Sequence, residues 1–128
     1  VVENACKKLN LDLKEILQAR SFTHFPLRLD LRKQYDSIHT DIRIPHTVFL
    51  YYVTDSDGET HLFNQTWDEV KDQKEFETAE FTLRQSVSPK KGRVLVFNGK
   101  IYHSSSGPVA SPNMRCIINF DAIADPIK

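Results

Sequence analysis

The sequence has no excess of charge of either sign and very little cysteine. Lys and Arg together number 17, as do Asp and Glu, and the isoelectric point is close to neutral. Without a basic field across the domain, we expect no nucleic-acid partner, although a local basic groove is left open. The two cysteines, Cys6 and Cys116, lie near opposite ends of the chain. This usage argues against a disulfide framework or a thiolate metal site and favours a reducing, cytoplasmic compartment.

Long apolar runs, internal repeats and low-complexity tracts are also missing from the sequence. Because no apolar stretch is long enough to span a bilayer, we expect no membrane partner. With 128 residues, of which 40% are hydrophobic, the composition is that of a globular protein built around one core. We therefore predict a single domain over residues 1–128. The chain begins at Val1 with neither a methionine nor a signal segment, and we expect it to be a trimmed form of a longer protein.

A helical pattern of apolar residues occurs near the start of the chain. Leu9, Leu13, Ile16 and Leu17 recur at helical intervals, and residues 21–26 break the pattern. The spacing predicts an N-terminal helix over residues 9–19.

From Ser37 onward the apolar residues come in short runs rich in β-branched and aromatic side chains. These runs predict strands at residues 37–42, 46–54, 60–63, 80–87, 92–99, 100–104 and 114–123. Turn signals separate several of them, for example at residues 55–58, 88–92 and 98–99. Short strands at such regular spacing favour a sandwich or barrel, so the sequence predicts a mainly β fold.

Residues 65–80 interrupt the strand pattern. Thr66 and Glu69 have the spacing of a capping box, and Asp68 suits the N-terminus of a helix. We therefore predict a short helix here. Its polar, mainly acidic composition fits either a solvated connector or a lid over a substrate site.

His39 and Asp41 are the first candidate metal ligands. Alternate residues of a strand point to the same side, so an imidazole and a carboxylate two residues apart can contact one ion. The pattern alone is a weak signal because it often arises by chance. His103 supplies context, since it lies 64 residues further on in the predicted strand of residues 100–104.

Arg115 stands inside the hydrophobic strand of residues 114–123, where it shares one face with Ile117 and Asn119. A buried guanidinium without a counter-charge costs several kcal/mol, so Arg115 is expected to face a protein carboxylate or a bound anion. A bidentate acid would match its planar donors.

Two histidines and one carboxylate leave open coordination positions, which is the arrangement of non-haem iron(II) oxygenases. A zinc ion could use His39, Asp41 and His103 together with water, but it would give Arg115 no purpose. The combination favours iron.

These residues stand within a longer ordered pattern. His39-Thr40-Asp41 is followed by Tyr-Tyr-Val-Thr-Asp (51–55), Gly-Glu-Thr (58–60), Pro-Lys-Lys-Gly-Arg-Val-Leu-Val-Phe (89–97), His103, Gly-Pro-Val (107–109) and Arg115. This order, over about residues 35–121, resembles the iron(II)/2-oxoglutarate oxygenases of the prolyl 4-hydroxylase-like type. The chain departs from that pattern at Asp57-Gly58, where two glycines are usual, and in the spacing between Tyr35 and His39.

The resemblance implies a double-stranded β-helix, or jelly roll, with an N-terminal helix and a core at about residues 35–123. It makes His39, Asp41 and His103 the ligands of Fe(II). Four further residues are implied to bind or line the pocket of 2-oxoglutarate: Arg115, Tyr52, Thr60 and Tyr35. Tyr52 has a second interpretation as a core aromatic residue, because Tyr51 and Tyr52 point to opposite faces of their strand.

The activity implied is oxidative decarboxylation of 2-oxoglutarate coupled, with O2, to hydroxylation of a prime substrate. That substrate is expected to be a peptide, such as a peptidyl proline, or a small metabolite, since fold and ligands do not determine it. The alternative is a cupin-like metal-binding or ligand-binding jelly roll without oxygenase activity. No role is predicted for His24, His46 and His61, or for the turn charges Lys90, Lys91 and Arg93.

Overall fold

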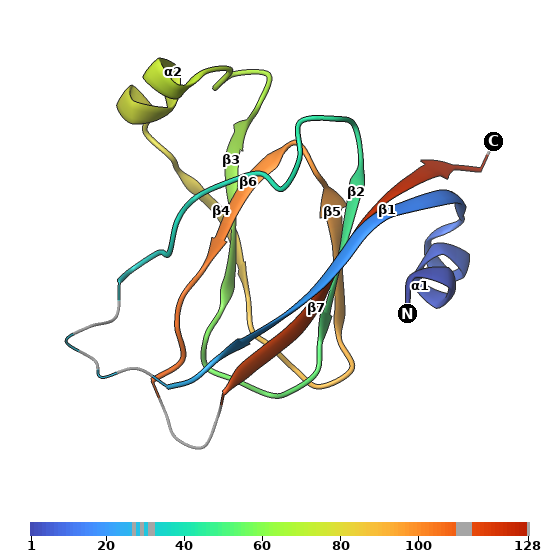
Figure 1. Cartoon of the computed structure of the whole chain (residues 1–128), viewed down its shortest axis with the longest axis horizontal. Helices are drawn as coiled ribbons and strands as arrows, with labels where there is room; N and C mark the ends of the chain where they lie inside the picture. The colour runs from blue at the N-terminus through green and yellow to red at the C-terminus, as the bar shows by residue number, and fades with distance from the viewer. Residues whose placement is uncertain (27, 29, 31–32, 110–113, 128) are drawn as a thin grey trace.

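The computed structural model describes residues 1–26, 28, 30, 33–109 and 114–127. Its strands form two antiparallel sheets (Figure 1). The four-stranded sheet has the order β1-β7-β2-β5, and the three-stranded sheet has the order β4-β3-β6. Their strands are β1 (Leu11–His24), β2 (Thr47–Tyr52), β3 (Thr60–Thr66), β4 (Leu83–Val87), β5 (Val94–Asn98), β6 (Ile101–Ser105) and β7 (Arg115–Pro126). The helices are α1 (Val2–Leu9) and α2 (Gln73–Thr78). The predicted mainly β class is confirmed.

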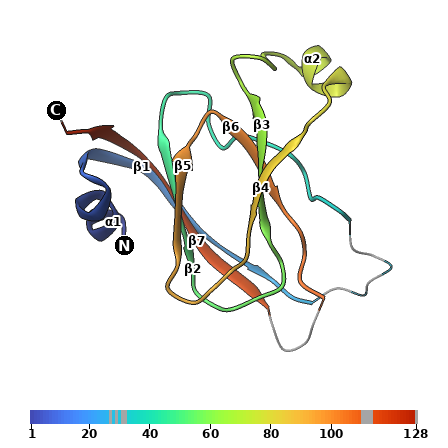
Figure 2. The ribbon, with the colours of Figure 1, turned by 180° about the vertical axis from the view of Figure 1, so that it is seen from behind.

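Strand β2 shows how the core joins the layers. Val48 packs with Leu62 of β3 and Phe97 of β5, so this cluster lies between the two sheets. Phe49 points the other way and packs against Ala122 of β7 and residues of α1. Because both faces of β2 are covered, its sequence is a continuous apolar run rather than an alternating one. Figures 1 and 2 show α1 on the side of the four-stranded sheet that faces away from the three-stranded sheet.

The prediction of a helix over residues 9–19 was wrong. Helix α1 ends at Leu9, followed by Asn10 in the left-handed conformation with φ 56°, and β1 begins at Leu11. Strand β1 pairs with β7 along its whole length, with irregularities between Leu13 and Glu15 and between Ile16 and Gln18. Such bulges shift the side-chain alternation by one residue, which gave the apolar residues a helix-like spacing.

The predicted strand at residues 37–42 was also wrong. In this segment His39 forms only an isolated bridge to His103, with backbone N–H···O distances of 3.0 and 2.9 Å in the two directions. The later prediction of a strand at residues 80–87 is correct only from Leu83. Paired strands extend from Leu11 to Pro126, beyond the predicted core of residues 35–123.

Helix α2 begins later than predicted. Thr66 is the last residue of β3, and its carbonyl accepts hydrogen bonds from Glu69 and Val70 in a turn. The N-cap is Asp72, whose side chain accepts a hydrogen bond from the Glu75 N–H at 2.8 Å. The helix is therefore capped by Asp72, three residues before Glu75, and not by Thr66 as predicted. Among the described residues, no helix has the length and apolar character needed to cross a membrane.

Candidate metal centre

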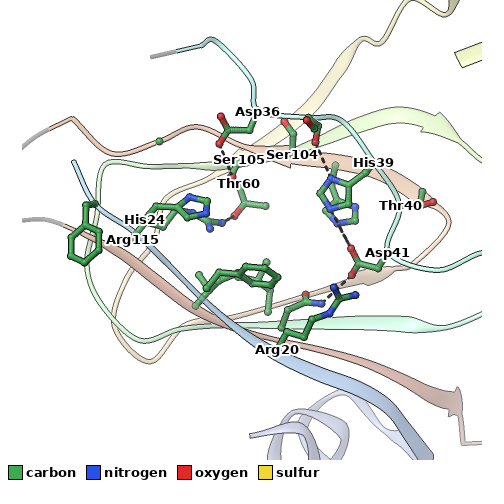
Figure 3. A pocket seen from close by; sticks show the side chains of 18 residues that line it. Arg20, His24, Asp36, His39, Thr40, Asp41, Thr60, Ser104, Ser105 and Arg115 are labelled. Carbon is green, nitrogen blue, oxygen red and sulfur yellow. Dashed lines mark hydrogen bonds and ion pairs between the residues drawn. The ribbon is translucent and has the colours of Figure 1, made fainter. Parts of the chain in front are cut away.

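The structure brings His39, Asp41 and His103 together. Figure 3 shows His39 and Asp41 side by side at one end of the pocket. Asp41 Oδ1 lies 3.3 Å from His39 Nε2 and 3.3 Å from His103 Nε2. His103 belongs to β6, while His39 and Asp41 lie in the connection before β2, held to β6 by the His39–His103 bridge. This single bridge places His39 next to His103, whereas the sequence predicted a full strand at residues 37–42.

Both imidazole rings are oriented by backbone carbonyls. His39 Nδ1 lies 2.9 Å from the Ser37 carbonyl oxygen, and His103 Nδ1 lies 2.9 Å from that of Ile101. A carbonyl oxygen only accepts, so each Nδ1 must carry the proton and donate. In the neutral ring the Nε2 lone pair then faces Asp41. Histidines that bind a metal through Nε2 have this tautomer, with Nδ1–H donating to a neighbouring oxygen.

This arrangement fits a divalent cation. Two ring lone pairs and a carboxylate repel one another unless a proton or a metal ion lies between them. Two ligand atoms that are each about 2.1 Å from one ion lie about 3.0–3.4 Å apart at octahedral to tetrahedral angles. The 3.3 Å separations between Asp41 Oδ1 and the two Nε2 atoms agree with that geometry.

The electrostatics keep Asp41 ionised. Burial acts to raise its pKa, but hydrogen bonding with His103 and His39 outweighs burial and holds the pKa well below its usual range. The interaction with Asp41 in turn raises the pKa of His39. Asn119 Nδ2 donates to Asp41 Oδ2 at 3.0 Å, so one carboxylate oxygen is anchored and the other faces the rings.

A pocket of about 720 Å³ adjoins the three candidate ligands. Its walls come from both sheets: Arg20, Phe22 and His24 of β1, Arg115 of β7, and Thr60 of β3. Figure 3 places Arg115, His24 and Thr60 on one side of the pocket and His39 and Asp41 on the other. Side-chain exposure of 51% for His39, against 7% for His103, shows on which side the centre is open. A small molecule in this pocket could contact the metal centre and Arg115 together.

Arg115 is 3% exposed. Its Nε donates to the Gly58 carbonyl at 3.0 Å and its Nη2 donates to Thr60 Oγ1 at 2.8 Å. None of the ion pairs found among the described residues includes Arg115. Burial lowers the pKa of Arg115, although arginine remains charged at any physiological pH. The pocket therefore contains a buried cation suited to an anionic ligand.

Gly58 makes room for this arginine. A Cβ at residue 58 would lie 2.6 Å from the Ser106 carbonyl oxygen and 3.1 Å from Arg115 Cδ. The glycine of the Gly-Glu-Thr motif is thus needed for the close approach of the chain to Arg115.

The other predicted 2-oxoglutarate residues lie in different places. Thr60 lines the pocket, and Tyr52 lies behind it, fully buried, with its hydroxyl donating to Thr60 Oγ1 at 2.7 Å. Burial raises the pKa of the Tyr52 hydroxyl. Tyr35 packs instead edge-on against the rings of His61 and Phe63, with centroid distances of 4.8 and 5.1 Å. Arg115 and Thr60 are therefore brought together in the pocket, whereas Tyr35 lies outside its lining.

Residues 65–80, the proposed lid, also contribute no lining residue to this pocket in the described chain.

Sequence reasoning missed a second polar cluster next to the first. The ligand atoms of Asp41, His46 and Asp121 all lie within 4.8 Å of one another. Asp121 lies on the same face of β7 as Arg115 and Asn119, so strand alternation could have revealed it. Arg20 and His24 were missed because their segment was not recognised as a strand.

Asp121 provides a prediction for stability against pH. Burial, and secondly its interaction with Asp41, raise its pKa from 3.8 to about 6. Because the folded-state pKa is raised, the carboxyl group stabilises the fold below pH 3.8, and this contribution is lost as the pH rises through about 6. Metal-free Asp121→Asn is therefore expected to be more stable than metal-free wild type above pH 6 and to lose that advantage near pH 4. Urea unfolding across this range measures the difference, and a pH-independent difference would contradict it.

Gly99 leaves the space that the His46 ring occupies. A Cβ at residue 99 would lie 2.1 Å from His46 Nε2, inside a region where the His46 side chain is fully buried. Gly99→Ala is expected to cost about 1–3 kcal/mol of folding free energy through overpacking. Chemical denaturation tests this, with His46→Ala/Gly99→Ala as the control, in which the alanine at 99 should cost much less. An equal cost in both backgrounds would show that His46 is not the obstacle.

Comparison with known proteins gives no assignment. No family model matches the chain, and no curated protein and no solved structure matches it. The function has to be inferred from the residues of the chain itself.

Proposed function

We propose that the chain is an iron(II)/2-oxoglutarate-dependent oxygenase that hydroxylates a small molecule or peptide. One observation supports this most: a two-histidine, one-carboxylate cluster shaped for a cation shares a pocket with a buried arginine that forms no ion pair among the described residues. The cluster accounts for a metal, and the arginine accounts for an anionic co-substrate beside it.

The strand order supports a double-stranded β-helix as the fold. Strand β2 lies in the four-stranded sheet, β3 and β4 in the three-stranded sheet, β5 in the first, β6 in the second and β7 in the first. The chain thus passes repeatedly between facing sheets, as in a jelly roll. The isolated bridge of His39 to His103 lies beside β6, at the place where an eighth strand would complete the three-stranded sheet.

The proposed iron ligands are His39 Nε2, His103 Nε2 and an oxygen of Asp41. Iron(II), when bound by two histidines and one carboxylate with positions left open, supplies the oxidising chemistry of this enzyme class. The Ser37 and Ile101 carbonyls accept from the two Nδ1 atoms, so in the neutral rings both Nε2 lone pairs are directed to the metal position. It also holds the Asp41 carboxylate ionised and fixed through Asn119.

Arg115 and Thr60 are proposed to bind the distal carboxylate of 2-oxoglutarate. Thr60 Oγ1 accepts from both Arg115 Nη2 and the Tyr52 hydroxyl, which uses its two lone pairs and leaves its own proton to donate. A carboxylate in this place would receive the Thr60 hydroxyl and the remaining guanidinium N–H groups. Tyr52 acts indirectly, because it orients Thr60.

The prime substrate is proposed to approach from β1. Arg20 and Phe22 of β1, together with Phe25 just beyond its end, line this part of the pocket and combine an apolar surface with a positive charge. An aliphatic C–H bond of a peptidyl proline or of a small metabolite is the proposed target. The cupin-like alternative, a metal-binding jelly roll without oxygenase activity, leaves the buried Arg115 without a ligand.

Turnover of the co-substrate tests the proposal. Purified protein with iron(II), O2 and 2-oxoglutarate is expected to form succinate, and a panel of proline-containing peptides and metabolites is expected to contain a compound that increases the rate. Asp41→Ala should form none, while Arg84→Ala, a change of an exposed residue on β4, should behave as wild type. Metal-loaded wild type that forms no succinate with any member of the panel would favour the cupin-like alternative.

A further inference from the structure

His46 is oriented in the same way as the two proposed iron-binding histidines. In all three residues Nδ1 lies close to the carbonyl oxygen two residues earlier: 2.9 Å for Ser37, 2.7 Å for Ile44 and 2.9 Å for Ile101. Each ring therefore donates through Nδ1 and presents Nε2 to an aspartate. His46 Nε2 is buried and has no hydrogen-bond partner among the described residues. A polar atom in this state is costly unless something outside the described chain satisfies it.

Two carboxylates face the same place. Asp121 Oδ1 lies 3.6 Å from His46 Nε2, and both side chains are fully buried. The other oxygen of Asp121 accepts from Gln18 Nε2 at 2.6 Å, just as the other oxygen of Asp41 accepts from Asn119. Each carboxylate is thus anchored through Oδ2. Asp41, His46 and Asp121 each have one ligand atom that lies within 4.8 Å of those of the other two.

We propose that Asp41, His46 and Asp121 form a second cation site, which shares Asp41 with the first. A divalent first-row metal ion such as Mn²⁺, Fe²⁺ or Zn²⁺ suits one imidazole and two carboxylates. The 3.6 Å between Asp121 Oδ1 and His46 Nε2 is slightly wider than the roughly 3.0–3.4 Å between two ligands of one ion. All three ligand atoms lie within 4.8 Å of one another, so binding an ion would draw the side chains slightly inward. Asp41 is shared between the two ions, as carboxylates are in two-metal centres.

The second ion would offset the negative charge that two aspartates place in one buried region. Asp41 and Asp121 bring two negative groups into a buried region in which the His46 lone pair also points inward. A cation there removes all three penalties at once. It would also bind Asp41, which belongs to the first site, and so restrict the movement of that carboxylate. The competing arrangement is a protonated His46 paired with Asp121 and no ion.

Metal stoichiometry distinguishes these arrangements. Metal-free protein is loaded with excess Mn²⁺ or, in a separate sample, Zn²⁺, desalted, and analysed for metal per chain by mass spectrometry, with titration calorimetry alongside. Wild type is expected to hold two ions, and His46→Ala and Asp121→Asn one each. His61→Ala is the matched control: His61 is also buried, but it contacts Ser86 and Ser106 instead, so this variant should keep two. Circular dichroism checks folding, and Asp121→Asn, which preserves size and the acceptor for Gln18, decides the matter if His46→Ala fails to fold.

The failures of the two proposed sites can be told apart. One ion in wild type that is lost in His103→Ala but kept in His46→Ala and Asp121→Asn overturns the second site and leaves the iron centre standing. Two ions in wild type and in both variants also overturn it, because the second ion must then bind elsewhere. No bound ion in wild type overturns both.

Discussion

Asp41→Asn is expected to abolish metal binding while leaving the fold intact. The change removes the only negative charge among the three proposed iron ligands and places an amide opposite two Nε2 lone pairs. Outer-shell partners of metal ligands are worth about 10–100-fold in affinity, so loss of the ligand itself should exceed about 100-fold. Calorimetric titration with Fe²⁺ or Mn²⁺ measures the effect, and circular dichroism checks the fold.

Asp36→Asn is the matched control for this change. Asp36 also lines the pocket, but its carboxylate accepts from Ser105 Oγ at 3.2 Å and does not belong to the metal cluster. Metal affinity should therefore be retained in Asp36→Asn. Equal affinity in Asp41→Asn and wild type would remove the basis for a metal centre at this place.

Arg115→Lys is expected to weaken 2-oxoglutarate binding without affecting the metal. Arg115 contacts Gly58 and Thr60 with two of its planar donors and has further N–H groups for a ligand. Lysine keeps the positive charge but lacks this planar set of donors. Loss of one charge-assisted interaction corresponds to a roughly 10- to 150-fold rise in KM for 2-oxoglutarate. Arg115→Ala should be worse, because charge and donors both disappear.

The control is Arg84→Lys, a conservative change on the exposed surface of β4, which should leave KM unchanged. If Arg115 were purely structural, its variants would chiefly lower thermal stability, and their remaining turnover would have a normal KM. That outcome would defeat the co-substrate assignment while leaving the metal centre untouched.

The residues that lie together at the pocket were easier to predict than the backbone that holds them. His39, Asp41 and His103 stand out because few residue types bind metals, and Arg115 stands out because a guanidinium in an apolar strand needs a partner. Neither inference requires the strand boundaries to be right. The connection around His39 was predicted as a strand, yet one bridge to His103 is enough to align the ligands.

The errors in the fold have a common cause, which is that long-range contacts decide between local signals of similar strength. Residues 11–24 carry a helix-like apolar spacing, but pairing with β7 through two bulges makes them a strand. Thr66 with Glu69 and Asp72 with Glu75 both have the spacing of a helix cap. Because Thr66 is the last residue of β3, helix α2 is capped by Asp72. His46 carries no local signal at all, since its importance depends on Asp121, 75 residues away.

Visible absorption without O2 tests most directly whether one pocket binds iron(II) and 2-oxoglutarate together. Anaerobic wild-type protein with iron(II) is expected to show a metal-to-ligand charge-transfer band only after 2-oxoglutarate is added. Asp41→Asn should show no band, and Arg115→Lys should need a higher concentration of 2-oxoglutarate to reach the same intensity. Tight iron binding in wild type without any such band at saturating 2-oxoglutarate would contradict the account.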